Sequence, residues 1–560
     1  MAKRYRPVQR DQPFLLPPDM REWLPEDHPV WLVIRAVEQH LDTSAAHAVR
    51  RTGGPGTAGY DPDMLVTLLV WAYANKVTSS RRIEELCCTD VAFRVICAGD
   101  VPDHVTVARF RAAFPGVAQE LFTQVLMLCA RLGMGQVGTV ALDGTKIAAG
   151  ASKAANRTEE TLRKLAAERS AEHAAADAAE DERSGEGSHG DRVPPGGAGG
   201  GSRDERIARA LADLEAERQA AQAQRDAQAQ AYLEALAAGQ APPGNVPAAA
   251  AVTAARQRLD RAGAAQRELI GAREARDAQA RAAGHRGERG KRPASLDGHA
   301  GVRRARAALA RAQARAADAG RKAAAKGPGP VRNITDPDSR LMPVRGGGFI
   351  QGYNAQNVTS AGKLIIATQL TQDTTDTQWF GPMLAAALDA AALITACKPP
   401  QTASSPTGHD APAGQDSAAA SNDSSDIALF LADAGYCSEH NLTIAGPDRL
   451  IATGKHRDLE KQARADDNPQ DSARSAATAA MAARLATEQG ITAYRHRGHI
   501  AETPHGHIKH NMGFRQLSMR GKPKAAAEWT FAATVHNLFK AITTGHLTPA
   551  ALDSLAPQPA

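Results

Sequence analysis

The chain has 560 residues and a net charge of +6, with hydrophobic residues at 43% and aromatic residues at only 4%. Its length predicts two to four domains, and its alanine-rich apolar fraction predicts a modest core accompanied by long helices. No apolar run approaches the roughly 20 residues of a membrane span, and the first ten residues lack an apolar signal core. We therefore expect a cytoplasmic protein.

The positive charge is concentrated towards the C-terminus. Between residues 494 and 524 the chain carries seven lysine or arginine residues and one acid, Glu502, so this basic window alone accounts for the net charge of +6. Such a concentration is typical of a surface that binds a polyanion, although a solvated basic helix would have the same composition.

The N-terminal part of the chain has a helical pattern. Residues 1–27 are expected to form an extended arm. Residues 28–130 contain short amphipathic segments, and a turn over residues 99–103 leads into a final helix. This pattern predicts an all-helical domain resembling a helix-turn-helix, with an ordinary helical bundle as the alternative. The expected DNA contacts on the final helix are His104, Thr106, Arg109 and Arg111.

Composition divides the rest of the chain. Residues 131–154 and 331–545 contain apolar strand segments and predict one α/β domain, interrupted by a disordered linker at 398–425. Residues 155–330 are dominated by Ala, Arg, Glu, Asp and Gln and have too few large apolar residues for their own core. They predict an inserted helical or coiled-coil arm. Residues 546–560 are expected to form a loose tail.

Three acids are candidates for catalysis. Asp143 and Asp433 each end an apolar strand segment, and in α/β sheets the carboxyl ends of strands line the ligand-binding crevice. Two carboxylates brought together there repel each other unless a cation offsets them, and Mg²⁺ or Mn²⁺ are the hard cations that prefer oxygen ligands. Glu502 is a third candidate ligand, surrounded by bases that suit phosphates.

Several short segments resemble those of a known family. They are Val140-Ala-Leu-Asp-Gly-Thr-Lys146, Asp336-Pro-Asp-Ser-Arg-Leu-Met342, Gly352-Tyr-Asn-Ala-Gln356, Leu431-Ala-Asp-Ala-Gly-Tyr436, and the spaced set Tyr494, Arg497, Glu502 and Lys509. Over about residues 10–150 and 330–545 the chain resembles the DDE transposases of bacterial insertion sequences, in the branch with a Tyr-Arg-Glu-Lys signature around the last acid.

The resemblance implies an RNase H-like catalytic domain, with a mixed five-stranded sheet flanked by helices. Asp143, Asp433 and Glu502 would hold two Mg²⁺ or Mn²⁺ ions roughly 3.5–4 Å apart, for DNA cleavage and strand transfer at terminal inverted repeats. Double-stranded DNA, both inverted repeats and target, would be the partner of a nucleoid-associated homodimer. The residues implied to contact DNA are Tyr494, Arg497, Lys509, Arg515 and Arg520.

Two other functions remain open. A non-catalytic DNA-binding scaffold would use the arm to oligomerise, but it would not need three acids at the ends of elements. An RNase H-like nuclease without strand transfer would not need the N-terminal module or the signature residues.

Local features add three expectations. Pro504 predicts a helix start, with Thr503 as the N-cap and Glu502 just before the helix. Asp336 and Asp338 lie in a turn signature and are expected to be structural. The histidines of the basic window lack zinc-site spacing and are expected to be exposed or to contact phosphates.

Overall fold

The computed structural model describes residues 19–48, 59–184, 202–238, 248–287, 290–324, 329–344, 346–398, 426–454 and 475–555. The described residues within Met1–Ala155 and Asn333–Ala560 form one compact unit, and those within Asn156–Arg192 and Arg203–Arg332 form a second. Most of the expected N-terminal arm, and the expected linker beyond Lys398, lie outside the described residues.

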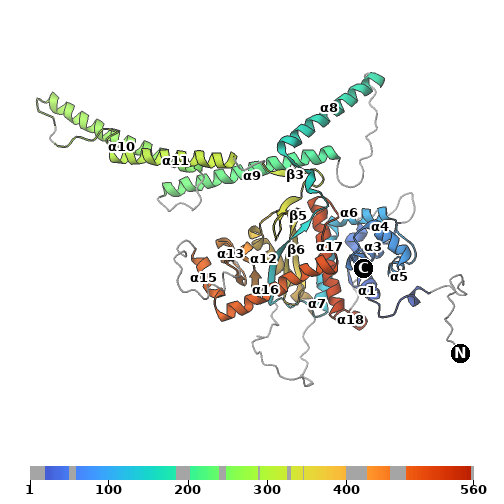
Figure 1. Ribbon diagram of the computed structural model, residues 1–560. Helices are drawn as coiled ribbons and strands as arrows, with labels where there is room; N and C mark the ends of the chain where they lie inside the picture. Colours follow the sequence, from blue (N-terminus) through green and yellow to red (C-terminus); the bar gives the residue numbers. More distant parts are fainter. Residues whose placement is uncertain are drawn as a thin grey trace, which may run out of the picture. The chain divides into compact units, whose positions relative to one another are not determined.

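The first unit contains a mixed sheet flanked by helices (Figure 1). Its strands are β1 (Thr139–Ala148), β4 (Arg340–Pro343), β5 (Phe349–Ser360), β6 (Ile365–Thr371), β7 (Leu429–Ala432) and β8 (Asp448–Ile451). The order is β4-β5-β1-β7-β8, and β6 also pairs with β5. The prediction of five strands was wrong by one, because β5 is long enough to pair with both β4 and β6 on the edge opposite β1.

The helices of this unit come from both ends of the chain. They are α1 (Pro29–His40), α2 (Ser44–Ala48), α3 (Pro62–Ala74), α4 (Ser80–Thr89), α5 (Val91–Ile96), α6 (His104–Ala112), α7 (Ala118–Arg131), α12 (Phe380–Cys397), α13 (Glu439–Thr443), α15 (Ala476–Leu485), α16 (Glu488–Gly506), α17 (Lys522–Thr543) and α18 (Pro549–Ser554). The expected loose tail instead contains α18, because Leu552 is buried and Asp553 pairs with Arg35 at 2.5 Å.

The sheet has two apolar faces because side chains alternate along each strand. Val140 and Leu142 of β1 belong to the larger core, which also contains residues of α3, α7, α12 and α17. Ala141 points the other way and joins a smaller core with Leu431 of β7 and Leu450 of β8. Helices α15 and α16 cover this second face through Met481, Leu485, Tyr494 and Ile500.

Helix α12 and the turn before it, Thr377–Cys397, have the length and the mean hydropathy, 1.6, of a membrane span. One such helix is weak evidence for a membrane, because core helices pass the same test. Phe380, Met383, Leu384 and Ile394 of α12 are buried in the core of the first unit.

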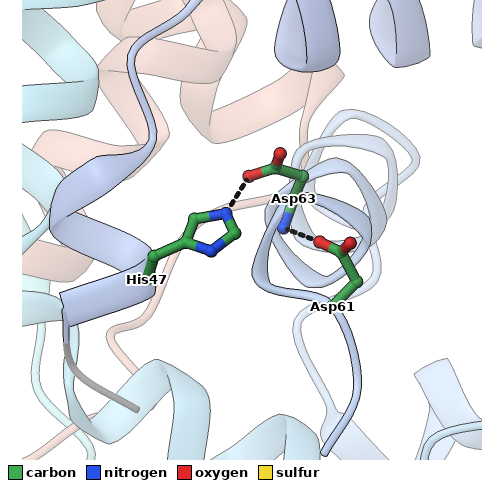
Figure 2. A group of neighbouring side chains, drawn as sticks. All are labelled: His47, Asp61 and Asp63. Carbon is green, nitrogen blue, oxygen red and sulfur yellow. Dashed lines mark hydrogen bonds and ion pairs between the residues drawn. The ribbon is translucent and has the colours of Figure 1, made fainter. Parts of the chain in front are cut away.

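The start of α3 brings together a small group of polar side chains (Figure 2). Asp61 accepts a hydrogen bond from the backbone N–H of Asp63 at 2.7 Å, as an N-cap does. The Asp63 carboxylate in turn bonds to the Nε2 atom of His47 at 2.9 Å and to the hydroxyl of Thr43 at 2.5 Å. Ligand atoms of His47, Asp61 and Asp63 lie within 4.8 Å of one another, but capping and the packing of α2 on α3 account for their arrangement.

The second unit consists of long helices on a two-stranded base. The strands β2 (Asn156–Thr158) and β3 (Val331–Asn333) pair with each other. The helices are α8 (Glu159–Ser184), α9 (Arg203–Ala237), α10 (Ala248–Ala282) and α11 (Ala300–Ala324), of which α10 packs on α11 and α8 on α9. Their buried residues, among those that the structure describes, are few and include several alanines, such as Ala210, Ala250 and Ala254.

A buried carboxylate joins the N-terminal helices to the sheet domain. Glu528 of α17 is 1% exposed and accepts hydrogen bonds from the Tyr73 hydroxyl at 3.0 Å and from Arg111 at 2.9 Å. It also accepts from the backbone N–H and hydroxyl of Ser518 and from the backbone N–H of Met519. Arg111 is itself buried, and its guanidinium donates further to the Thr78 carbonyl at 2.5 Å.

Replacing Arg111 with alanine is expected to lower the free energy of unfolding of the first unit by about 3–5 kcal/mol, because Glu528 would remain charged and buried. All five tryptophans of the chain lie in this unit, so urea denaturation followed by tryptophan fluorescence reports on it alone. Arg109→Ala, at an exposed position of the same helix, should change the value by no more than about 0.5 kcal/mol. Equal effects of the two substitutions would refute the structural role of Arg111.

Burial lowers the pKa of His536 in α17 to about 3, from an ordinary value of 6.5. The unfolded chain therefore binds this proton more readily, so the contribution of His536 to stability is complete above pH 6.5 and declines as the pH falls towards 3. Below pH 6.5 the loss should reach about 1.4 kcal/mol per pH unit. In urea titrations at a series of pH values, His536→Gln should flatten this slope, while exposed His440→Gln should keep it. An unchanged slope in His536→Gln would contradict the assignment.

Candidate active site

The sheet register places Asp143 beside Asp433. Strands β1 and β7 run parallel, and Leu142 lies opposite Ala432. The residues that follow them, Asp143 and Asp433, are therefore neighbours. Asp433 directly follows the last residue of β7, at the strand end where it was predicted. The same prediction for Asp143 was wrong, because β1 continues to Ala148 through its pairing with β5 on the other edge.

Both aspartates face the helix that carries the third candidate acid. Asp143 lies two residues after Ala141, and Asp433 lies two residues after Leu431, so strand alternation directs both to the face covered by α16. Asp143 is 8% exposed. Asp433 is partly exposed, and it caps the turn Ala434–Tyr436 by accepting from the Gly435 N–H at 2.9 Å.

Glu502 lies within α16, which continues through Pro504 to Gly506 and then into a π-helical turn, His507–Asn511. The predicted helix start at Pro504, with Thr503 as its N-cap, was wrong. A proline removes its own backbone hydrogen bond and its ring crowds the carbonyl four residues earlier. Here the helix tolerates Pro504 and passes into the π-helical turn within three residues. The Thr503 hydroxyl donates to the His499 carbonyl at 2.6 Å instead of capping a new helix.

Arg497 links the acids of the two elements. Its Nη1 atom lies 3.8 Å from Asp143 Oδ1, and its Nη2 atom lies 3.4 Å from Glu502 Oε1. The guanidinium also lies over the ring of Tyr494, 5.9 Å from its centroid. Tyr494 is 8% exposed, and burial raises its pKa to about 12. Tyr494 therefore packs beneath Arg497 instead of projecting into solvent, which differs from the expected direct contact with DNA.

The bases after Glu502 divide into inward and outward sets. Lys509 points inward, and its Nζ atom donates to the Thr145 hydroxyl at 2.6 Å and to the Lys146 carbonyl at 2.7 Å. Burial lowers the pKa of Lys509. Arg515 and Arg520 are exposed, and each donates through Nε to a backbone carbonyl, that of Lys509 and that of Gly150.

The expected DNA contacts of α6 also divide. Arg109 is exposed. His104 bonds to Glu84 at 2.8 Å, and Thr106 bonds through N–H and hydroxyl to the N-cap Asp103. The expectation for Arg111 was wrong, because its buried guanidinium is held by Glu528 and by the Thr78 carbonyl.

The remaining expectations concern neighbouring turns. Asp336 and Asp338 are buried and structural, since they accept backbone N–H bonds from Gly521 and Lys522 at the start of α17. The histidines of the basic window are not all exposed as predicted. His505 is buried beside Trp529, and burial lowers its pKa to about 4.

Asp376 was not among the predicted site residues, but it lies next to one of the candidate acids, Asp433. One of its oxygens comes within 3.4 Å of the point beside Gly435 where a Cβ atom would stand, and Asp433 Oδ1 comes within 3.0 Å of the same point. Asp376 Oδ1 accepts from Asn354 Nδ2 at 2.6 Å and from Gln356 Nε2 at 2.7 Å.

Asp376 brings side chains of several of these segments together. Lys146, which follows the Asp-Gly-Thr segment, lies with its Nζ atom 3.5 Å from Asp376. Gln356 connects it to Tyr436 of the Asp-Ala-Gly-Tyr segment, whose hydroxyl donates to the Gln356 side-chain oxygen. Asp376 belongs to none of the short segments that resemble the known family. The signal that points to Asp376 is the need of the Asn354 and Gln356 side-chain amides for a common acceptor.

Replacing Asp376 with alanine should lower the free energy of unfolding by about 1–3 kcal/mol, because Asn354, Gln356 and Lys146 would each lose an acceptor. Urea denaturation followed by tryptophan fluorescence measures this change. Asp389→Ala, an exposed acid in α12, is the matched control and should stay within about 0.5 kcal/mol of the wild type. An Asp376→Ala protein as stable as the control would show that Asp376 does not organise these side chains.

Two parts of the chain match known protein families. Residues 18–113, which include α1 to α6, match the model described as Transposase domain (DUF772). Residues 460–542, which include α16 with Glu502 and nearly all of α17, match the model described as Transposase DDE domain. No curated protein and no solved structure matches the chain. The two domain matches together support the assignment of this chain to the DDE transposases of insertion sequences, proteins of transposition and DNA recombination.

Proposed function

We propose that this chain cuts DNA at the terminal inverted repeats of its element and joins the freed ends to target DNA. Asp143, Asp433 and Glu502 are the proposed metal ligands. The observation that carries the proposal is the register of β1 and β7, which sets Asp143 beside Asp433 on the face covered by α16, where Glu502 lies. Acids on two adjacent strands of a mixed sheet, with a third on a covering helix, support an RNase H-like catalytic domain.

The chemistry of the donors fits divalent cations. All three candidate ligands are carboxylates, which Mg²⁺ and Mn²⁺ prefer. Asp143 and Glu502 already converge on a positive charge, the guanidinium of Arg497. Two ions held there would polarise the scissile phosphate and activate the attacking hydroxyl group.

The surrounding residues have two proposed roles. Arg515, Arg520 and Arg109 are exposed and would neutralise DNA phosphates. Tyr494 and Lys509 would position the site: Tyr494 supports Arg497, and Lys509 fixes β1 directly after Asp143. Arg497, whose side chain is 12% exposed, would hold the acids and face the bound DNA from within the site.

The proposal predicts cleavage of DNA carrying the ends that flank the gene, in Mg²⁺ or Mn²⁺. Asp143→Asn, Asp433→Asn and Glu502→Gln keep the side-chain shapes but remove a charged ligand, so each should reduce cleavage by at least about a hundredfold. Binding of the same DNA, measured by fluorescence anisotropy, should persist. Glu439→Gln, at an exposed acid of α13, is the matched control and should cut normally.

The outcomes separate the three candidate functions. A variant that cuts as fast as the wild type removes its residue from the ligand set. A wild-type protein that binds the ends but never cuts them indicates a non-catalytic scaffold. Cleavage without joining to a target plasmid indicates a nuclease that lacks strand transfer.

A further inference from the structure

The helices of the second unit differ in the sign of their charge. Helices α8 and α9 together contain fifteen acidic and nine basic residues, whereas α10 and α11 contain fourteen basic and five acidic residues. Helix α11 alone has seven bases and one acid, Asp318. The near-neutral charge of the chain outside the basic window therefore hides a second basic segment.

The bases of α11 form a stripe. Arg304, Arg311, Arg315 and Lys322 are separated by seven, four and seven residues, which places them on one face of an α-helix. All four are exposed. The stripe extends over about 27 Å at 1.5 Å per residue. Val302 and Leu309 lie on another face, and α11 packs on α10.

Little in the described part of the second unit neutralises this stripe. Lys322 pairs with Asp318 at 2.9 Å. Arg304 donates to the Ala300 carbonyl of its own helix at 3.4 Å. Arg304, Arg311 and Arg315 form no ion pair with an acid among the residues that the structure describes.

Several of the described acids of α8 and α9 already have partners within the same unit. Glu159 pairs with Arg163 and with Arg218, and Asp204 pairs with Arg169 at 2.8 Å. These pairs occupy part of the acidic surface that α8 and α9 could offer to a second copy of the chain. A partner for the stripe must bring its own closely spaced negative charges.

We propose that the stripe on α11 binds the phosphate backbone of duplex DNA. A duplex carries one negative charge per about 1.7 Å of its axis, so a stripe of this length can meet several phosphates. Three of the four bases are arginines, whose planar guanidinium suits phosphate oxygens. The binding is to phosphates and does not read sequence. The identification of the polyanion as DNA rests on the proposed function, but the surface is separate from the catalytic acids.

The test uses the full-length protein carrying Asp433→Asn, so that binding is measured without cleavage. The stripe variant is Arg304→Gln, Arg311→Gln and Arg315→Gln, which removes three charges and keeps good helix formers. The control variant is Arg163→Gln, Lys164→Gln and Arg225→Gln, which removes three exposed charges from α8 and α9. Fluorescence anisotropy with a labelled duplex, over a range of salt concentrations, gives the affinity and its salt dependence.

The stripe variant should bind at least about tenfold more weakly than the control, and its slope of log affinity against log salt should be shallower by about 2 to 3. Equal affinities and slopes for the two variants would overturn the proposal. A stripe variant that loses self-association in sedimentation, with unchanged DNA binding, would assign the surface to a second copy. The wild-type cleavage assay is independent of this result: failure to cut, with a stripe-dependent salt slope, would refute the proposed catalysis and leave the DNA-binding surface.

Discussion

The carboxylate of Glu528 is the interaction on which the first unit depends. It lies in the second turn of α17 and accepts hydrogen bonds from α3, from α6 and from the segment that leads out of the π-helical turn. A buried charge is costly unless it is paired and fully bonded, and here the bonds come from three separate parts of the chain. The N-terminal helices, the basic window and α17 are therefore held in one arrangement. This arrangement also fixes where α16 ends relative to β1.

The dependence on contacts between distant parts of the chain explains which residue positions could be predicted from the sequence. Asp433 and the strand before it follow from local alternation and a turn signal, and these features act over a few residues. The position of the Arg111 side chain depends instead on a contact with a distant part of the chain. Its place on a helix with His104 and Arg109 suggested DNA, but its partner Glu528 is separated from it by 417 residues, and no local pattern contains that contact. Asp376 was missed for the same reason, because its donors come from β1 and β5.

The prediction of a helix start at Pro504 failed for a related reason. The expectation that proline begins or ends a helix considers the backbone alone. Helix α16 is also stabilised by its packing on the second face of the sheet through Tyr494, Ile500 and Ala501. Burial of that face outweighs the cost of a proline inside a helix, about 3 kcal/mol. The five-strand prediction erred less seriously, since β4 is a short strand on an edge that β6 also occupies.

The long insertion fits this fold because its two ends meet. Ile334 donates its N–H to the Ala155 carbonyl at 3.1 Å, and Asn333 donates its side-chain amide to the Ser152 carbonyl at 2.8 Å. The cost of closing a loop grows only slowly with its length, so a long excursion between β1 and β4 adds little to the cost of a short one. Its sequence can then diverge in composition without disturbing the sheet. The segregation of acids in α8 and α9 from bases in α10 and α11 is a pattern that a spacer does not require, which argues that the insertion has a partner.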